Sequence, residues 1–212
     1  MAPDAPDQLP EIRTRWSEVS GGIDAAHSYQ RRFDELVEQG ADINGEARFV
    51  TGLRPAPARI LDAGCGTGRI ATTLTALGHD VVGVDADPAM IEVARARDDV
   101  TRFVHADLAD LALSGQAFDI VLLAGNVVPF VADGTLVDVL RRMHEHLTLD
   151  GVLVAGWSLP GNQPGGAAAV STEAYERAAF AAGLVLVTRY ASWDAEQWPG
   201  DGSYALTLHR RR

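Results

Sequence analysis

The chain of 212 residues contains no lysine, since all 18 of its basic residues are arginines. Without lysine there can be no phosphate-binding loop of the G-x-x-x-x-G-K type and no Schiff base with pyridoxal phosphate. The Tyr-x-x-x-Lys pair of short-chain dehydrogenases is excluded for the same reason. Composition alone therefore removes several cofactor chemistries.

Cysteine is almost as scarce. Cys65 is the only one, so no disulfide can form within the chain, and we expect a cytoplasmic protein. No apolar run is long enough to span a bilayer, and the acidic, proline-rich residues 1–10 are expected to form a disordered tail. The net charge of −11 disfavours nucleic acid as a partner. We therefore expect neither a membrane nor a nucleic-acid partner.

Strand-like and helix-like segments do alternate from residue 59 onward. Short apolar runs are followed by segments in which apolar residues recur every three to four positions. The last two strand-like segments, 184–193 and 203–210, are joined by a turn-rich connection with no room for a helix, so we expect an antiparallel hairpin. The pattern predicts an α/β fold with a Rossmann-like, seven-stranded mixed sheet, parallel except for an antiparallel last strand, and helices on both faces.

Residues 11–53 precede this alternation and are predicted to form an N-terminal helical cap on a single globular domain of residues 54–212. The helix predicted over residues 24–39 begins with Asp24 as its N-cap. Its apolar stripe must be buried, so the cap is expected to pack onto the domain. The residues of that stripe are Ala25, Tyr29, Phe33 and Leu36.

The stretch ILDAGCGTGR, residues 60–69, follows the first predicted strand. In open α/β sheets ligands bind beyond the carboxyl ends of the strands, and the first strand-to-helix turn is the usual anchor. The dinucleotide fingerprint G-x-G-x-x-G/A fits poorly, because counting from Gly64 places Arg69 at the third glycine position. Glycines at 64, 66 and 68 carry no Cβ, so they would let the backbone approach a ligand closely.

This stretch resembles the first motif of class I S-adenosylmethionine (SAM)-dependent methyltransferases, (V/I)LDxGCGTG, and the resemblance extends over residues 58 to about 157. It implies that Asp62 lies near the ammonium of SAM, and that Asp107 binds the adenine amino group. Asp85 follows Gly64 by 21 residues, a spacing suited to ribose hydroxyls that nicotinamide sites share. The residues expected to contact SAM or its product S-adenosylhomocysteine are Asp62, Ala63, Gly64, Cys65, Gly66, Gly68, Asp85, Ala86, Met90, Asp107, Leu108, Ala124, Gly125 and Asn126.

The resemblance implies methyl transfer from SAM to a small-molecule acceptor, a displacement that depends mainly on positioning. No cluster with metal-ligand spacing is present in the sequence, so no metal is expected. The catalytic candidates are His27, as a general base, and Asn126, which would orient ligand or acceptor. Cys65 is expected to pack beside the ligand rather than to react. The residues expected in the acceptor pocket are Trp16, Tyr29, Phe33, Phe130 and Trp157.

Two alternatives stay open at this point. One is a nicotinamide-dependent reductase on the same topology, although the absent lysine removes the commonest proton donor. The other is a SAM-binding module without catalysis. The sequence does not decide which acceptor atom is methylated, nor whether the protein is a monomer or a homodimer.

Overall fold

The structure is a computed structural model that describes residues 14–212, so the tail predicted over residues 1–10 lies outside the described residues. Seven strands form one sheet in the order β3-β2-β1-β4-β5-β7-β6. Strand β7 is antiparallel to both of its neighbours, and the other pairs are parallel. This confirms the predicted mixed sheet. The strands are β1 (Arg59–Ala63), β2 (Asp80–Asp85), β3 (Arg102–His105), β4 (Phe118–Leu123), β5 (Leu147–Ser158), β6 (Leu184–Tyr190) and β7 (Tyr204–Arg211).

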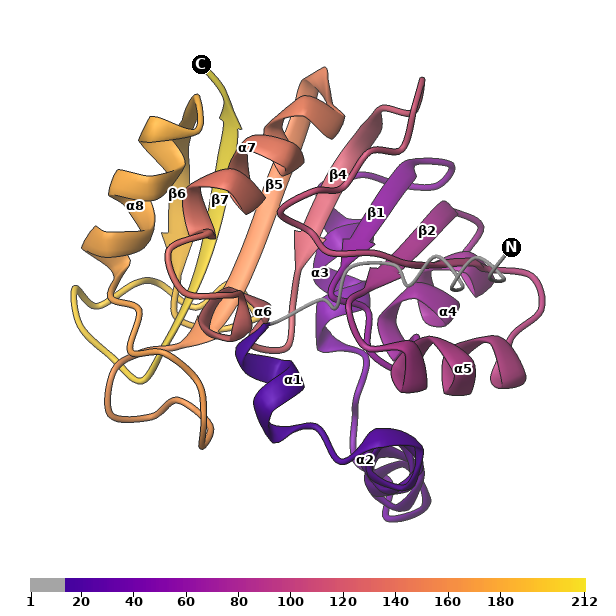
Figure 1. The fold of residues 1–212 in the computed structure, drawn as a ribbon. Coiled ribbons are helices and arrows are strands. Elements are labelled where there is room, and N and C mark those ends of the chain that lie inside the picture. The colour runs from indigo at the N-terminus through magenta and orange to yellow at the C-terminus, as the bar shows by residue number, and fades with distance from the viewer. Residues whose placement is uncertain (1–13) are drawn as a thin grey trace, which may run out of the picture.

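Helices cover both faces of this sheet (Figure 1). Ile70 and Leu74 belong to the buried cluster on one face, and Leu140 and Met143 to the cluster on the other. No helix within residues 14–212 is long and apolar enough to cross a membrane. The helices of the described chain are α1 (Arg15–Val19), α2 (Gly22–Glu38), α3 (Gly45–Leu53), α4 (Arg69–Ala76), α5 (Pro88–Arg97), α6 (Val127–Phe130), α7 (Leu136–His146) and α8 (Thr172–Ala181).

The order of the strands creates a switch point between β1 and β4. From β1 the chain moves outward through β2 and β3, then returns to the other side of β1 and continues through β4 and β5. In open sheets of this kind a crevice forms beyond the carboxyl ends of the strands at such a point. Figure 1 shows α1, α2 and α6 gathered at one end of the sheet.

Helix α2 differs from the prediction in its start and in its buried face. Gly21 is its N-cap residue, and Asp24 lies within the first turn. Its buried residues are Ala26 and Gln30, while Tyr29 is 37% exposed. Apolar spacing shows that a helix has an apolar face, but it does not show which face its neighbours will cover. Here α5 and the glycine turn cover the face of Ala26 and Gln30, one residue beyond the predicted Ala25 and Tyr29.

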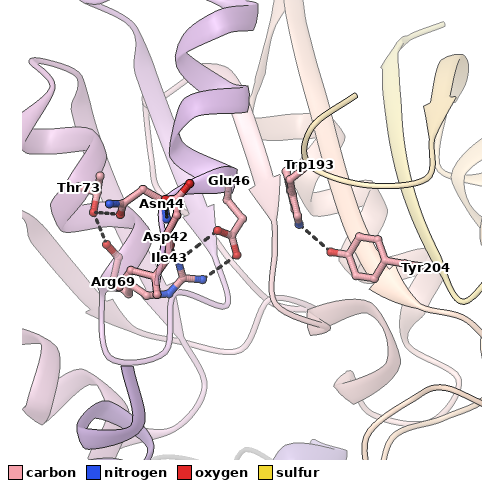
Figure 2. Close-up of polar contacts among 8 residues, drawn as sticks. All are labelled: Asp42, Ile43, Asn44, Glu46, Arg69, Thr73, Trp193 and Tyr204. Atoms are coloured by element: carbon pink, nitrogen blue, oxygen red, sulfur yellow. Dashed lines mark hydrogen bonds and ion pairs between the residues drawn. The ribbon is translucent and has the colours of Figure 1, made fainter. Parts of the chain in front are cut away.

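Polar contacts attach the N-terminal helices to the start of α4, beside the glycine turn (Figure 2). Arg69, the first residue of α4, donates to both carboxylate oxygens of Glu46, at 2.7 and 3.1 Å, and its guanidinium lies 4.7 Å from the centre of the Phe33 ring. The buried hydroxyl of Thr67, in the glycine turn, donates to Gln30 Oε1 of α2 at 2.5 Å. Bidentate and buried polar contacts of this type fix geometry as well as adding energy. Helices α2 and α3 are therefore held directly against residues 67–69.

Candidate functional site

A cleft of about 700 Å³, measured out to its open mouth, lies beyond the carboxyl ends of β1, β2, β3 and β4. The position is the switch point of the sheet, where ligands of open α/β sheets bind. Turns from four strands and side chains from α1, α2 and α6 converge there. Its lining residues are Thr14, Trp16, Tyr29, Gly64, Gly66, Asp85, Ala86, Met90, Asp107, Leu108, Gly125, Asn126, Val127, Phe130 and Val131.

Many of the residues singled out from the sequence meet in this cleft. Those expected at SAM that line it are Gly64, Gly66, Asp85, Ala86, Met90, Asp107, Leu108, Gly125 and Asn126. Those expected at the acceptor that line it are Trp16, Tyr29 and Phe130. Sequence reasoning missed Thr14, Val127 and Val131. Val127 begins the segment VVPF and Val131 follows it, and the position of that segment directly after Asn126 was the available signal.

Three residues expected at the acceptor or as a base lie elsewhere. Trp157 is fully buried in the core, where its ring packs 4.5 Å from Tyr175 and its indole N–H donates to the Val170 carbonyl at 2.9 Å. Phe33 lies under the Arg69 guanidinium and does not line the cleft. His27 is exposed on α2, outside the cleft lining. A residue that lies close in sequence to lining residues can therefore point away from the cleft, because successive side chains of a strand or helix point in different directions.

Five residues expected at SAM stand behind the cleft rather than on its surface. Ala63 and Ala124 are buried in the core. Cys65 is half-buried, and burial raises the pKa of its thiol, which disfavours the reactive thiolate form. Asp62 and Gly68 also lie outside the lining.

The structure requires glycine at the three positions of the turn for different reasons. Gly64 has φ +86°, and a Cβ there would lie 2.3 Å from Val127 Cγ2. Gly68 has φ +82°, and its Cβ would lie 2.7 Å from Phe103 Cζ. Only at Gly66 is there open space, with Tyr29 Cε1 as the nearest side-chain atom at 4.0 Å. The expectation that all three make room for a ligand is therefore corrected at positions 64 and 68, where protein side chains fill the space.

Asp85 closes the turn from the second strand. Its Oδ2 accepts the Gly66 N–H at 2.7 Å and its Oδ1 accepts the Asp87 N–H at 2.9 Å. Burial raises the pKa of this carboxyl to about 6. A carboxylate oxygen has two acceptor sites, so each oxygen keeps one for a ligand hydroxyl. Asp107 is similar, since among the described residues its carboxylate accepts one hydrogen bond, at Oδ1 from the Ala109 N–H at 2.9 Å.

Asp62 is 1% exposed, and within the described part of the chain its Oδ2 has no hydrogen-bond partner. Burial raises the pKa of this carboxyl to about 7, and the charge of nearby Arg69 opposes that shift. An unpartnered buried carboxylate oxygen is costly, so a donor or a cation beside it would stabilise the ionised form.

The lining of the cleft carries two aspartates and no basic side chain among residues 14–212. Carboxylate oxygens accept hydrogen bonds, so the two aspartates complement a ligand rich in hydroxyl and amino donors. In the same described range no group of three histidine, cysteine or acidic residues could hold a metal ion.

Comparison with known proteins agrees with this chemistry. Residues 60–151 match the model of a methyltransferase domain. The crystal structure of a TehB-like SAM-dependent methyltransferase from Corynebacterium glutamicum superposes with a TM-score of 0.81 at 32% sequence identity, over 89% of this chain and 99% of that one.

Two curated relatives also match. An Azorhizobium caulinodans ubiquinone biosynthesis O-methyltransferase is 39% identical over 107 residues, which are 48% of this chain and 41% of that protein. A Streptomyces fradiae dTDP-3-amino-3,6-dideoxy-alpha-D-glucopyranose N,N-dimethyltransferase is 30% identical over 148 residues, which are 66% of this chain and 58% of that protein. The matches thus span only part of these relatives' length. They give no support to the nicotinamide-dependent reductase, and the chain belongs to the class I SAM-dependent methyltransferases.

Proposed function

We propose that this chain transfers the methyl group of SAM to a small-molecule acceptor. The observation that carries the proposal is the cleft itself, in which the carboxylates of Asp85 and Asp107 have further acceptor sites and no basic side chain of residues 14–212 lines the cavity. The family supports the same reaction, and the two curated relatives are named for methyl transfer to oxygen and to nitrogen. Because one relative is named for oxygen and the other for nitrogen, the two names do not decide which acceptor atom this chain methylates.

The residues of the cleft fit SAM group by group. The free acceptor sites of Asp85 suit the two ribose hydroxyls, and Asp107 with the Leu108 backbone suits the adenine edge. The unpartnered oxygen of Asp62, behind Gly64, suits the ammonium of the methionine part, because a cation there offsets a buried negative charge. When bound, SAM supplies an electrophilic methyl group on a sulfonium sulfur.

The rest of the cleft would hold the acceptor. Trp16 packs edge-to-face against Phe130, with ring centres 5.4 Å apart, and against Tyr29 at 6.3 Å. These aromatic side chains exclude water and orient a flat apolar body. Holding two reactants in line removes much of the barrier to a displacement, so no catalytic triad is required. We propose no catalytic role for His27 or Cys65.

We also propose that residues 11–53 act as a cap on one globular domain of residues 54–212. The contacts of Trp16 support this division, since its indole N–H donates to Asp87 Oδ2, at the start of α5, at 2.9 Å. Gln30 and Phe33 add the contacts to residues 67–69 described above.

Calorimetry with S-adenosylhomocysteine tests the proposal on the variant Asp85→Asn. The added amide N–H cannot accept a ribose hydroxyl, and a hydrogen bond to a charged group is worth about 1.5–3 kcal/mol, so the affinity should fall at least about tenfold. The matched control is Asp80→Asn, at the opposite end of the same strand, where the carboxylate is 76% exposed. That variant should bind like the wild type.

Release of S-adenosylhomocysteine from SAM in the presence of phenols, carboxylic acids and amines then tests catalysis. Equal affinity of both aspartate variants, or binding of NADH in place of S-adenosylhomocysteine, would refute the cofactor assignment. Tight SAM binding with no turnover on any acceptor class would favour the non-catalytic module.

A further inference from the structure

The side chain of Asn126 is fixed in one orientation at the wall of the cleft. Its Oδ1 accepts the N–H of Ser158 at 2.7 Å, across the carboxyl ends of the neighbouring strands β4 and β5. A backbone N–H can only donate, so the amide atom that it meets must be the oxygen. The amide nitrogen must therefore point elsewhere, and within residues 14–212 it has no hydrogen-bond partner while the residue lines the cleft.

The backbone at this position is also specialised. Gly125 and Asn126 both have φ +70°, in the left-handed region that asparagine tolerates better than most residues. Such backbone is found mainly where the surrounding structure holds it, often at functional sites. The turn leads directly into α6, whose Phe130 stands in the aromatic cluster with Trp16 and Tyr29.

The cleft thus offers an acceptor a fixed pair of N–H donors beside an aromatic wall. An oxygen nucleophile can accept one of these hydrogen bonds and still hold a lone pair for attack. An amine nitrogen has a single lone pair, which the same hydrogen bond would occupy, and an ammonium has none. The donor therefore discriminates by the number of lone pairs on the reacting atom.

The lining also limits how the acceptor loses its proton. Among the described lining residues the titratable side chains are Tyr29, Asp85 and Asp107, and there is no histidine. The two aspartates are those that we assign to SAM, and burial raises the pKa of the Tyr29 hydroxyl, so the described lining residues offer no dedicated base. A hydroxyl that ionises to water without help, as in a phenol or an enol, fits such a site, and a hydrogen bond from Asn126 favours its charged form.

Resting on the proposed methyl transfer, we propose that Asn126 is the residue that selects the acceptor, and that the acceptor is a phenolic or enolic oxygen on a flat apolar body. The proton leaves to solvent before reaction. The oxygen lone pair then forms the O–C bond to the methyl carbon, the C–S bond breaks, and the sulfur keeps that electron pair as a neutral thioether. The N–H of Asn126 holds the oxygen throughout.

Equilibrium binding to the full chain saturated with S-adenosylhomocysteine tests this proposal. The probes are 4-nitrophenol, whose phenolate absorbs visible light, and 4-nitroaniline, an amine of matched size and shape. The wild type should bind 4-nitrophenol as the phenolate, and at least about tenfold more tightly than 4-nitroaniline, the size of a lost hydrogen bond to a charged group.

The variant Asn126→Asp keeps an oxygen for the Ser158 N–H and a residue type that tolerates the backbone, but replaces the donor with an acceptor. It should lose at least about tenfold in affinity for 4-nitrophenol and change little toward 4-nitroaniline. Asn162→Asp, at an exposed position outside the cleft, makes the same change of charge and should bind both probes like the wild type. If Asn126→Asp does not fold, Asn126→Gly removes the amide at a position where glycine also suits the backbone.

S-adenosylhomocysteine affinity, measured on the same samples, separates the two proposals. Three outcomes would overturn the acceptor assignment if S-adenosylhomocysteine affinity is normal, and each would leave methyl transfer standing. They are no binding of 4-nitrophenol, equal binding of both probes, and full 4-nitrophenol binding by the Asn126 variants. Loss of S-adenosylhomocysteine binding by the wild type would instead remove the function on which it rests.

Discussion

Alanine substitutions at Gly64 and Gly66 separate packing from ligand contact within one turn. At Gly64 the new Cβ would lie 2.3 Å from Val127 Cγ2, in backbone with φ +86°. Left-handed backbone costs a non-glycine residue about 1–2 kcal/mol, and overpacking costs about 1–3 kcal/mol more. Gly64→Ala should therefore lower the free energy of unfolding by about 2–5 kcal/mol.

At Gly66 the φ is +54° and the new Cβ would meet open space near Tyr29. Gly66→Ala should lose only about 1–2 kcal/mol of stability from its backbone conformation. Its methyl group would project into the cleft, however, so S-adenosylhomocysteine affinity should fall at least about tenfold, within the cost of about 1–3 kcal/mol of overpacking at the bound ligand.

Urea unfolding followed by circular dichroism gives the stabilities, and calorimetry gives the affinities. The clash is tested directly by adding Val127→Ala to Gly64→Ala, which removes the two atoms within 2.9 Å and should restore at least about 1 kcal/mol relative to additivity. Strict additivity of the two substitutions, or a Gly64→Ala protein as stable as the wild type, would refute the packing account. Unchanged affinity in Gly66→Ala would place the ligand away from this turn.

Two further predictions concern buried polar groups. The pKa of Asp62 is about 7 in the folded protein and about 3.9 when unfolded, so the folded state binds more protons between these values and its stability should fall as pH rises from about 4 to 7. Asp62→Asn should reduce this slope in urea unfolding curves, and a slope equal to the wild type would contradict the assignment. Gln30→Leu removes the acceptor of the buried Thr67 hydroxyl and should cost about 1–3 kcal/mol. Adding Thr67→Val should recover part of that loss, and no recovery would show that the hydrogen bond is not its cause.

Several features of the site could be predicted from residue spacing. The aspartates at 85 and 107 follow strands, and parallel strands end at the same edge of a sheet, so their convergence required only the correct strand assignment. The start of helix α5 is also set by local signals, because Asp87 accepts the Ala89 N–H at 2.9 Å and Pro88 occupies the first turn. Both features depend on residues close together in the sequence, so local backbone geometry is enough to predict them.

Other features depended on contacts between distant segments. Trp157 was expected at the acceptor, but its side of β5 faces α8, and the Val170 carbonyl that accepts its N–H comes from the long loop before that helix. The apolar spacing of α2 predicted a stripe through Phe33, whereas the Arg69 guanidinium covers that ring. A sequence shows that a side chain is apolar, and not which partner will cover it.

The sequence by itself determined the alternating α/β order, the antiparallel last strand and the motif at residues 60–68, because each rests on short-range periodicity or on residue types at fixed spacing. Only the tertiary structure decided that Gly64 makes room for Val127, and that Ser158 holds the oxygen of Asn126. Both are contacts between segments far apart in the chain. Their geometry follows from how the strands are ordered and how the loops close, which no local pattern encodes.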